Sequence, residues 1–219
     1  MLQHFLSLTN ASRVLEDLHT LRSFGATGGG LHGYGVSRPA LSDSDIAARQ
    51  WLMTRMEDAG LGGVQMDGLG TLYGSAGMDA MPAVLMGSHS DTQPQGGWLD
   101  GALGVAYALE AARVLRQGGA ADIAAWSVVN WNDEEGRFGV LTASSAFVGR
   151  PLPNSRELWS ARRDHGLAGV PVMHASGRHG GWAGYLEAHI EQGPRLERGG
   201  ARLGVVEAIV GLRHIRIAW

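Results

Sequence analysis

Two short apolar segments with a helical segment between them constrain the fold of this chain most. Residues 83–87 and residues 123–129 are short apolar runs of the kind that form buried strands. Residues 101–116 place apolar side chains along one side of a helix, which Gly118 and Gly119 stop. A strand, a helix and a second strand in this order form a parallel pair with a right-handed crossover. We therefore expect an α/β fold in which helices flank a mixed, mostly parallel sheet.

Other segments supply the rest of the expected layers. Residues 42–45 resemble a capping box, and the apolar positions that follow predict a helix ending at Gly60. The remaining expected elements are helices at residues 14–24 and 157–164 and extended segments at residues 64–66, 71–73, 184–194 and 205–218. Between residues 151 and 181 the pattern otherwise indicates loops.

The composition excludes several classes of protein and of metal site. The 219 residues carry a formal net charge of −3, so there is no basic footprint for nucleic acid or for an anionic membrane. The chain has no cysteine, which excludes disulfides, thiolate zinc sites and cysteine nucleophiles. Any metal must therefore be held by histidine and carboxylate. No window has the apolar length of a membrane span, and a cytoplasmic protein is expected.

Polar residues follow both predicted strands. His89 and Asp91 come after the first strand, Asp100 lies a few residues further on, and Glu134 and Glu135 come after the second strand. Carboxyl ends of parallel strands meet at one edge of a sheet, so these side chains should converge. A carboxylate such as Asp91 can orient a ligating histidine, and adjacent glutamates can divide the roles of ligand and general base. This order is the one a metal-dependent hydrolase needs.

Each of these features also has a simpler interpretation. A lone His-x-Asp pair is more often a surface hydrogen-bonded pair, adjacent glutamates usually start a solvated helix, and His189 alone is as easily a strand-surface residue as a ligand. Their combination favours the metal site. A glycine pattern at residues 28–33 matches the dinucleotide motif, but it follows a predicted helix where that motif follows a strand. We interpret the other seven histidines as structural or exposed.

Four segments in register carry a family resemblance. They are residues 87–92, 96–105, 133–138 and 189–194. Together they resemble the M20 metallopeptidase clan and, within it, the amidase and carbamoylase branch of N-carbamoyl-L-amino-acid hydrolases, allantoate amidohydrolases and β-ureidopropionases. The resemblance covers nearly the whole chain. It implies the phosphorylase/hydrolase-like catalytic domain of the zinc exopeptidases.

The same resemblance implies roles for individual residues. The implied metal ligands are His89, Asp100, Glu135 and His189, with Asp100 bridging two divalent ions. Glu134 is then the general base, Asp91 orients His89, and Gln192 belongs to the substrate pocket. The peptide after Asp100 is implied to be strained and often cis. Histidine and carboxylate suit zinc, manganese, cobalt or nickel, so the native ion stays open.

The implied reaction is hydrolysis of a C–N bond, other than a peptide bond, in a small linear amide. An N-carbamoyl-L-amino acid is the expected substrate. The alternatives are allantoate or ureidoglycolate within the same branch, and the peptide substrates of an M20 exopeptidase. An inactive, truncated metal-binding fragment is the alternative of a different class.

The chain also departs from the family. Members of this branch are much longer, with a lid and dimerisation domain inserted after the strand that ends near Trp219, and a catalytic domain that then resumes. Residues 1–204 are accordingly expected to form the N-terminal part of the catalytic domain, and residues 205–219 the first strand of the lid. A last histidine ligand and a carboxylate-binding arginine have no counterpart here. We therefore expect little activity from these 219 residues alone, and a homodimer at full length.

Overall fold

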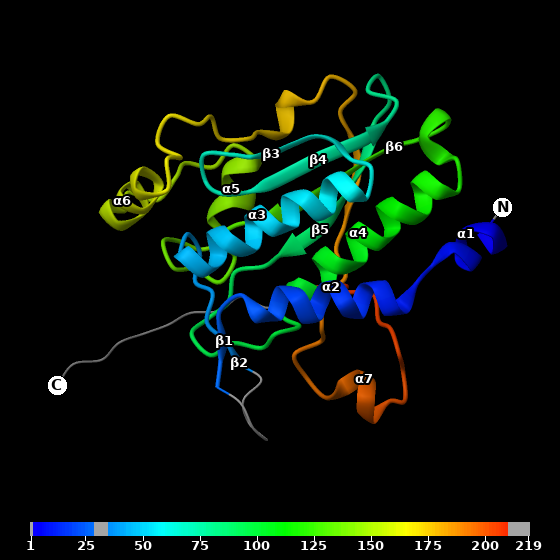
Figure 1. The fold of residues 1–219 in the computed structure, drawn as a ribbon, viewed down its shortest axis with the longest axis horizontal. Coiled ribbons are helices and arrows are strands. Elements are labelled where there is room, and N and C mark those ends of the chain that lie inside the picture. The colour runs from blue at the N-terminus through cyan, green and yellow to red at the C-terminus, as the bar shows by residue number, and fades with distance from the viewer. Residues whose placement is uncertain (1, 29–34, 210–219) are drawn as a thin grey trace.

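The computed structural model of the protein describes residues 2–28 and 35–209 and is built on a five-stranded mixed sheet (Figure 1). In spatial order the strands are β3 Gly62–Met66, β4 Leu72–Gly77, β6 Ala125–Trp131, β5 Ala83–His89 and β7 Trp182–Leu186. Strand β4 is antiparallel to both β3 and β6, whereas β5 is parallel to both β6 and β7. All strands except β4 thus run in one direction, which confirms the predicted mostly parallel mixed sheet.

The central unit is the predicted strand, helix and strand. Strands β5 and β6 pair in parallel from Val84 opposite Trp126 to His89 opposite Trp131, and helix α4 Ala102–Gln117 connects them. Strand β6 begins two residues later than expected, because Ile123 and Ala124 still belong to the turn that ends the short 3-10 helix η1 Ala120–Asp122, where their N–H groups bond to the carbonyl of Ala120. Every residue of β6 is buried, as expected for the middle strand of a sheet covered on both faces.

Three helices cover one face of the sheet. Helices α2 Ala11–Ser23, α3 Asp43–Asp58 and α4 contribute Leu18, Leu52 and Leu109 to a core that also contains Trp126 of β6. The expected cap of α3 is present, since the hydroxyl of Ser42 accepts the backbone N–H of Asp45 at 3.3 Å. Helix α1 Leu2–Leu8 extends beyond α2 and has no buried residue.

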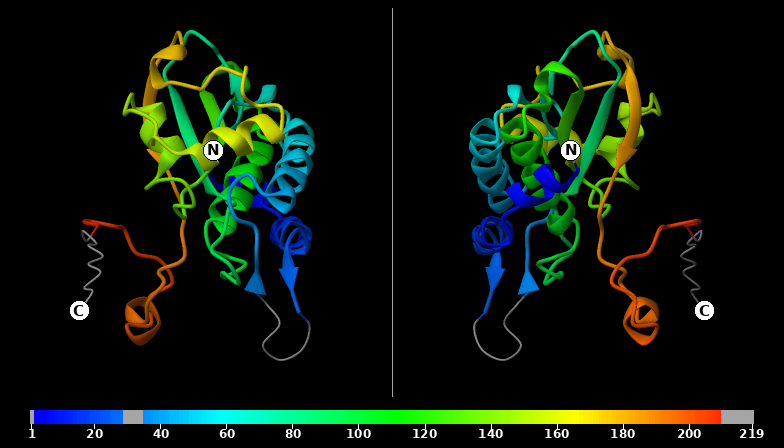
Figure 2. Two further views of the ribbon diagram at one scale, coloured as in Figure 1. Left: turned by 90° about the vertical axis from the view of Figure 1, so that its left-hand side faces the viewer. Right: turned by 90° about the vertical axis from the view of Figure 1, so that its right-hand side faces the viewer.

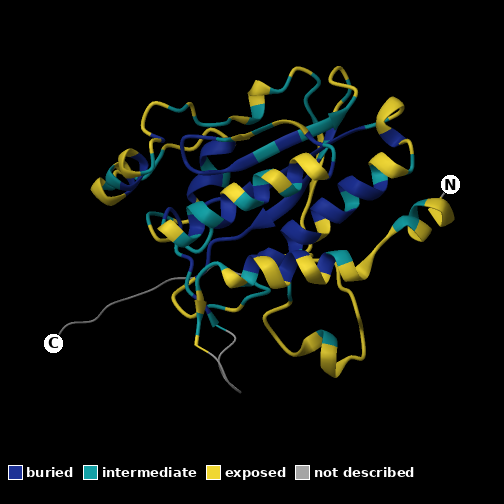
Figure 3. Cartoon of the chain, in the orientation of Figure 1, coloured by how far each residue is buried: buried dark blue, intermediate teal, exposed yellow. Residues whose placement is uncertain are grey.

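Two shorter helices cover the opposite face. Helices α5 Thr142–Phe147 and α6 Arg156–Asp164 pack Phe147 and Leu158 against a second core, to which β6 contributes Val129 and Trp131. Residues of β6 alternate between the two cores, and Figure 3 shows the middle of the sheet in the dark blue of buried residues. Helix α6 was predicted, whereas α5 was not, because six residues are too few to establish a helical period.

The C-terminal part of the described chain lies away from this core. Beyond β7, the short helix α7 Arg195–Arg198 and the residues around it are mostly exposed and lie to one side of the main body (Figure 2). The extended segment predicted at 184–194 is a strand only as far as Leu186. Residues 205–209 form no strand, and the rest of the segment predicted at 205–218 lies outside the described residues.

Two small elements complete the described chain. Strands β1 Ala26–Thr27 and β2 Gly35–Val36 form an antiparallel pair, and η2 Ala175–Gly177 is a single 3-10 turn. The glycine pattern at 28–33 lies outside the described residues except for Gly28. Within residues 2–28 and 35–209, no helix combines the length and the apolar character needed to cross a membrane.

Candidate metal centre

The candidate site starts at the carboxyl ends of β5 and β6. His89 is the last residue of β5 and lies opposite Trp131, the last residue of β6. Glu134 and Glu135 follow β6 after two intervening residues. The sheet therefore brings the imidazole and the adjacent glutamates to one edge, as the sequence predicted.

The imidazole of His89 is fixed in the tautomer that suits a metal ligand. Its Nδ1 lies 3.0 Å from the main-chain carbonyl oxygen of Asp91, which can only accept, so Nδ1 carries the proton in the neutral ring. Its Nε2 is buried and has no hydrogen-bond partner among the described residues. A buried polar nitrogen without a partner is costly, and a metal ion at Nε2 would satisfy it.

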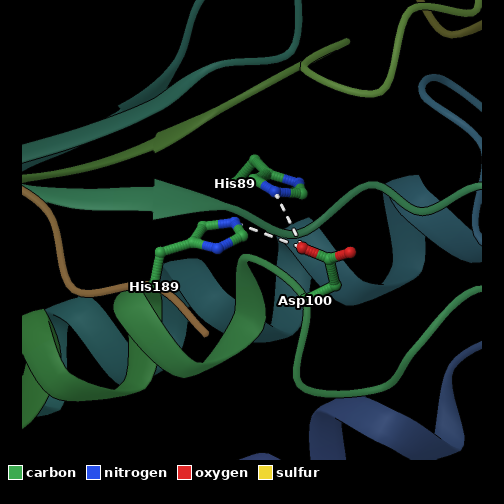
Figure 4. Close-up of side chains that lie close together, drawn as sticks. All are labelled: His89, Asp100 and His189. Atoms are coloured by element: carbon green, nitrogen blue, oxygen red, sulfur yellow. Dashed lines mark ion pairs between the residues drawn. The ribbon is translucent and has the colours of Figure 1, made fainter. Parts of the chain in front are cut away.

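His189 approaches the same point from the segment after β7. Its Nε2 lies 3.2 Å from Oδ1 of Asp100, and the same oxygen is 3.9 Å from Nε2 of His89 (Figure 4). Like His89, His189 bonds through Nδ1 to a main-chain carbonyl, here that of Ile190 at 2.9 Å. Both imidazoles therefore direct Nε2 at one carboxylate oxygen, although they lie a hundred residues apart in the sequence.

The short contact between Asp100 and His189 shifts the pKa values of both groups. The hydrogen bond to Asp100 raises the pKa of His189 to about 9. The same bond holds the pKa of Asp100 below its ordinary value, with further lowering by the charge of His189. In the metal-free protein this contact is therefore an ion pair at neutral pH.

Gly101 allows the imidazole of His89 to lie against the backbone. A Cβ atom at this position would lie 2.3 Å from the ring of His89, and the backbone has φ +63°, which side chains rarely adopt. The described residues contain no cis peptide bond, so the expected cis peptide after Asp100 is not present. The sharp turn at this point is instead accommodated by the glycine.

Glu134 and Glu135 also lie close to the imidazole of His89. Oε2 of Glu134 is 3.5 Å from Nε2 of His89. Partial burial raises the pKa of Glu134, and the nearby carboxylates of Glu135, Asp91 and Glu187 raise it further. Glu135 accepts a hydrogen bond from Nε2 of Gln93 at 3.1 Å. A carboxylate with a raised pKa beside an imidazole is suited to proton transfer near neutral pH.

Two groups of side chains could each hold an ion among the described residues. His89, Asp100 and His189 offer ligand atoms that lie within 4.8 Å of one another, and His89, Glu134 and Glu135 do the same. The groups share His89. Asp100 belongs only to the first group and Glu135 only to the second. The predicted bridging role, in which Asp100 also binds the ion held by Glu135, therefore stays a prediction. Imidazole nitrogen and carboxylate oxygen fit zinc and related divalent ions.

Asp91 is fully buried, but its carboxylate has a different principal contact from the predicted one. Its Oδ1 lies 3.7 Å from Nδ1 of His89, further than the Asp91 carbonyl oxygen that bonds the same nitrogen. The carboxylate instead accepts the backbone N–H groups of Glu134 at 3.4 Å and Glu135 at 3.1 Å. Asp91 thus orients His89 through its main chain and holds the glutamate turn through its side chain. Burial raises the pKa of this carboxyl.

The buried guanidinium of Arg49 contacts the residues that lead into the turn of Glu134 and Glu135. Arg49 has no exposed surface, and it donates to Asp45 at 2.9 Å, to Oδ1 of Asn132 at 2.7 Å and to the carbonyl of Trp131 at 3.1 Å. Its Nη2 is also 4.0 Å from Oδ1 of Asp91. Arg49 therefore connects helix α3 to the end of β6. Sequence reasoning missed it, because a single arginine within a helix is usually on the surface.

Two residues that the motifs singled out have structural contacts in this chain. Asp133 is buried, and its carboxylate accepts from the backbone of Phe138 and Gly139 and from the hydroxyl of Thr142, so it fixes the loop after the glutamates. Gln192 donates through Nε2 to Oδ2 of Asp100 at 2.5 Å. The predicted role of Gln192 in substrate binding stays a prediction.

A cavity of about 460 Å³ opens beside the second group of ligands. Ser42, Asp91, Gln93, Glu135 and Arg137 are among the residues that line it. Such a volume lies within the roughly 300–1,000 Å³ that small-molecule sites occupy. The carboxylates therefore border a space that a small substrate could enter.

Comparison with known proteins places these features in a family. Residues 69–161 match the model of peptidase family M28. An N-carbamoyl-L-amino-acid amidohydrolase of Paenarthrobacter aurescens is 34% identical to this chain. The match covers 97% of this chain and 53% of the amidohydrolase. A solved amidase of the hydantoinase/carbamoylase family from Burkholderia phymatum is 46% identical, with a TM-score of 0.78, and covers 88% of this chain. Over most of its length, the chain is thus similar to the hydantoinase/carbamoylase amidases.

The relatives also include a ureidoglycolate hydrolase of Arabidopsis thaliana, which is 32% identical over 83% of this chain. The predicted amidase and carbamoylase branch is thus confirmed, while the matching family model is that of M28 and covers only the middle of the chain. The chain spans about half the length of the curated amidases it matches, 53% and 50% for two of them.

Proposed function

We propose that the protein is a metal-dependent amidohydrolase that cleaves the C–N bond of a carbamoyl group in a small linear amide. The observation that carries the proposal is the convergence of two imidazole Nε2 atoms on one oxygen of Asp100, with the buried Nε2 of His89 left without a hydrogen-bond partner in the part of the chain that the structure describes. The names of the relatives support the reaction, since amidohydrolases acting on N-carbamoyl-L-amino acids match nearly the whole chain.

In this proposal the residues near His89 divide into ligands and a base. His89, Asp100 and His189 would hold one divalent ion, and Glu135 with Asp100 would hold a second. Zinc, manganese, cobalt and nickel all suit these donors. Glu134 is not assigned as a ligand, because its raised pKa suits it to accept and return a proton.

The chemistry requires an activated nucleophile, because a ureido carbonyl is a poor electrophile. Bound divalent ions lower the pKa of water and polarise the carbonyl oxygen. Glu134 takes the proton of the attacking water and returns it to the leaving nitrogen. Asp91 and Arg49 keep the backbone of the glutamate turn in place during this transfer, because the turn's N–H groups bond to the Asp91 carboxylate.

The proposed substrate is an N-carbamoyl-L-amino acid, whose hydrolysis yields ammonia, carbon dioxide and the free amino acid. Allantoate and ureidoglycolate are the alternatives within the family, since a ureidoglycolate hydrolase and an allantoate deiminase are also among the relatives. Gln192, beside Asp100, is proposed to contact the substrate.

The domain assignment is likewise a proposal. Residues 1–204 form the N-terminal part of the catalytic domain, and residues 205–219 begin a lid that also carries the dimer contact. The exposure of Leu203, Val205, Val206 and Ile209, between 76% and 93%, supports a covering partner for this end of the described chain. A cytoplasmic homodimer is proposed for the whole protein.

The test is a comparison of substrates on the metal-loaded protein at full length, because little activity is expected from these 219 residues alone. Ammonia release from N-carbamoyl-L-amino acids, allantoate and ureidoglycolate is measured together with cleavage of a dipeptide, for the parent and for Glu134→Gln. We expect ammonia release from a carbamoyl substrate that Glu134→Gln lowers about a hundredfold or more, as loss of a general base does. Faster cleavage of the dipeptide would indicate an exopeptidase instead. Metal binding without any turnover would favour the second candidate, a metal-binding protein without hydrolytic activity.

A further inference from the structure

The end of β7 is not held by the sheet at the point where His189 is needed. Strand β5 continues as far as His89, where it still pairs with β6. The pairing of β5 with β7 ends at Met86 opposite Leu186, three residues before His189. Residues 183–189 are also exposed, so core packing contributes little there. Something other than backbone pairing must fix the position of His189.

A carboxylate that the proposed mechanism does not use spans this gap. Glu187 accepts the hydroxyl of Ser88 at Oε1, at 2.5 Å, and the hydroxyl of Tyr185 at Oε2, at 2.9 Å. Ser88 directly precedes His89 and is fully buried. The hydrogen bond between Ser88 and Glu187 therefore links the residue before His89 to the residue two positions before His189.

The hydrogen bonds extend to the third strand of the site. The indole N–H of Trp131 donates to the Tyr185 hydroxyl at 2.9 Å, and Trp131 is the residue opposite His89 in the sheet. Glu187 with Ser88, Tyr185 and Trp131 thus joins the ends of β5, β6 and β7. We name these four residues the Glu187 brace.

Helix α4 backs the brace from the other side. A Cβ atom at Gly104 would lie 2.3 Å from the carbonyl oxygen of Ala188 and 2.6 Å from Cβ of Ser88. Only a glycine lets the helix approach the crossing of these two segments so closely. Residues 187–188 are therefore confined between the helix and the end of β5, with Glu187 as the polar attachment.

We propose that Glu187 is a positioning residue that sets the approach of His189 to Asp100. It contacts no reacting atom. It holds the end of β7 against Ser88, so that the Nε2 atoms of His89 and His189 face the same carboxylate oxygen. The assignment rests on the proposed function, in which these two imidazoles share one ion.

Conservative replacement should preserve most of this geometry. In Glu187→Gln the amide oxygen can accept from Ser88, and the amide nitrogen can donate to the Tyr185 hydroxyl. That hydroxyl can then donate to the carbonyl of Gly87, which already lies 3.3 Å away. Glu187→Ala leaves the buried hydroxyl of Ser88 without this acceptor and removes the attachment.

The experiment compares Glu187→Ala and Glu187→Gln with a matched control. Glu191→Ala removes a carboxylate two residues after His189, whose oxygens bond only to the backbone of Arg195 and Leu196 among the described contacts. Affinity for Co²⁺ is measured by chelator competition, and the visible absorption of bound Co²⁺ reports its coordination. Far-UV circular dichroism and thermal melting confirm that each variant is folded.

We expect Glu187→Ala to weaken Co²⁺ binding about 10- to 100-fold, as loss of groups that orient metal ligands does, and to change the absorption spectrum. Glu187→Gln should stay within about threefold of the parent, and so should Glu191→Ala. Unchanged affinity in Glu187→Ala would overturn the proposal. Equal weakening in Glu191→Ala would also overturn it, because the effect would then be general loosening of residues 187–191.

A second measurement separates this proposal from the proposed function. If the parent bound no Co²⁺, the proposed function would fail, and crystal structures of the metal-free parent and Glu187→Ala would still test the brace. The brace requires the Asp100–His189 contact of 3.2 Å to be kept in the parent and lost in the variant. The same contact in both structures would overturn it.

Discussion

At the scale of single residues, the site depends on which nitrogen of each histidine is free. His89 and His189 both bond through Nδ1 to a main-chain carbonyl and direct Nε2 at Asp100. A carbonyl cannot donate, so each neutral ring keeps its proton on Nδ1 and its lone pair on Nε2. The backbone therefore selects the ligating tautomer, a role that sequence reasoning assigned to the carboxylate of Asp91.

The raised pKa of His189 predicts a pH-dependent metal affinity. Below a pKa of about 9 the imidazole of the metal-free protein carries a proton, and an ion must displace it. We expect the apparent affinity for Zn²⁺ to rise with pH from 7 to 9, by up to about tenfold per unit, and then to level off. Competition with a chelator of known pH dependence measures this. An affinity that is flat between pH 7 and 9 would contradict the ion pair.

Through His189, the same ion pair makes the stability of the metal-free fold fall as the pH rises, whereas the metal affinity rises. The pKa of His189 is raised from 6.5 to about 9, so its contribution to stability is fully present below pH 6.5 and is lost as pH rises through 9. The lowered pKa of Asp100 adds a contribution that is lost in acid. Metal binding and the metal-free ion pair therefore favour different ends of the pH range.

At the scale of elements, the site is made by three strand ends and by one helix that passes close behind them. Strands β5 and β6 are held in register to their last residues, whereas β7 leaves the sheet before His189. Helix α4 can approach because Gly104 has no side chain. The helix therefore determines how near the β7 segment lies to the other two strands.

Adding a methyl group at Gly104 tests this close approach. Alanine favours a helix over glycine by about 1 kcal/mol, so an unconstrained helix would gain stability. We expect Gly104→Ala instead to lose about 1–3 kcal/mol in urea unfolding, the usual cost of overpacking, and to bind Zn²⁺ more weakly. Tyr107→Ala on an exposed part of the same helix is the control and should leave Zn²⁺ affinity unchanged. A more stable Gly104→Ala variant would show that α4 does not confine residue 188.

At the scale of the whole molecule, the sheet and both cores of the described chain form without the residues after β7. The two buried clusters lie above and below β6 and contain no residue beyond Trp182. The segment that carries His189 is exposed and adds a ligand to an already folded body. A metal ion would therefore connect the folded body to this segment.

Metal binding should accordingly stabilise the chain. At a free ion concentration of 100 times the dissociation constant, linkage gives about 2.7 kcal/mol, measurable as a raised melting temperature with Zn²⁺, Mn²⁺ or Co²⁺. EDTA should reverse the shift, and His89→Ala should abolish it, since His89 belongs to both ligand groups. His165→Ala should retain it, because His165 belongs to neither group and bonds instead to the carbonyl of Leu41. A melting temperature unaffected by metal and EDTA would contradict the site.

The elements with a strong local signal were predictable from the sequence. Helices α2, α3, α4 and α6 and strands β3 to β6 were expected close to their observed positions, because periodicity and caps are local properties. Helix α5, the early end of β7 and the pair β1–β2 were not, since short elements depend on what they pack against. The convergence of His89 with the two glutamates followed from the geometry of parallel strands, whereas the family resemblance implied that Asp100 and His189 join them.

What the sequence by itself determined is the α/β layering and the set of polar residues at one sheet edge. Only the tertiary structure decided how those residues are held. Ser88 and Glu187 are 99 residues apart, and Arg49 and Asn132 are 83 apart, so no local pattern relates either pair. These contacts exist because a folded sheet brings distant segments within hydrogen-bonding distance, where buried polar groups must find partners.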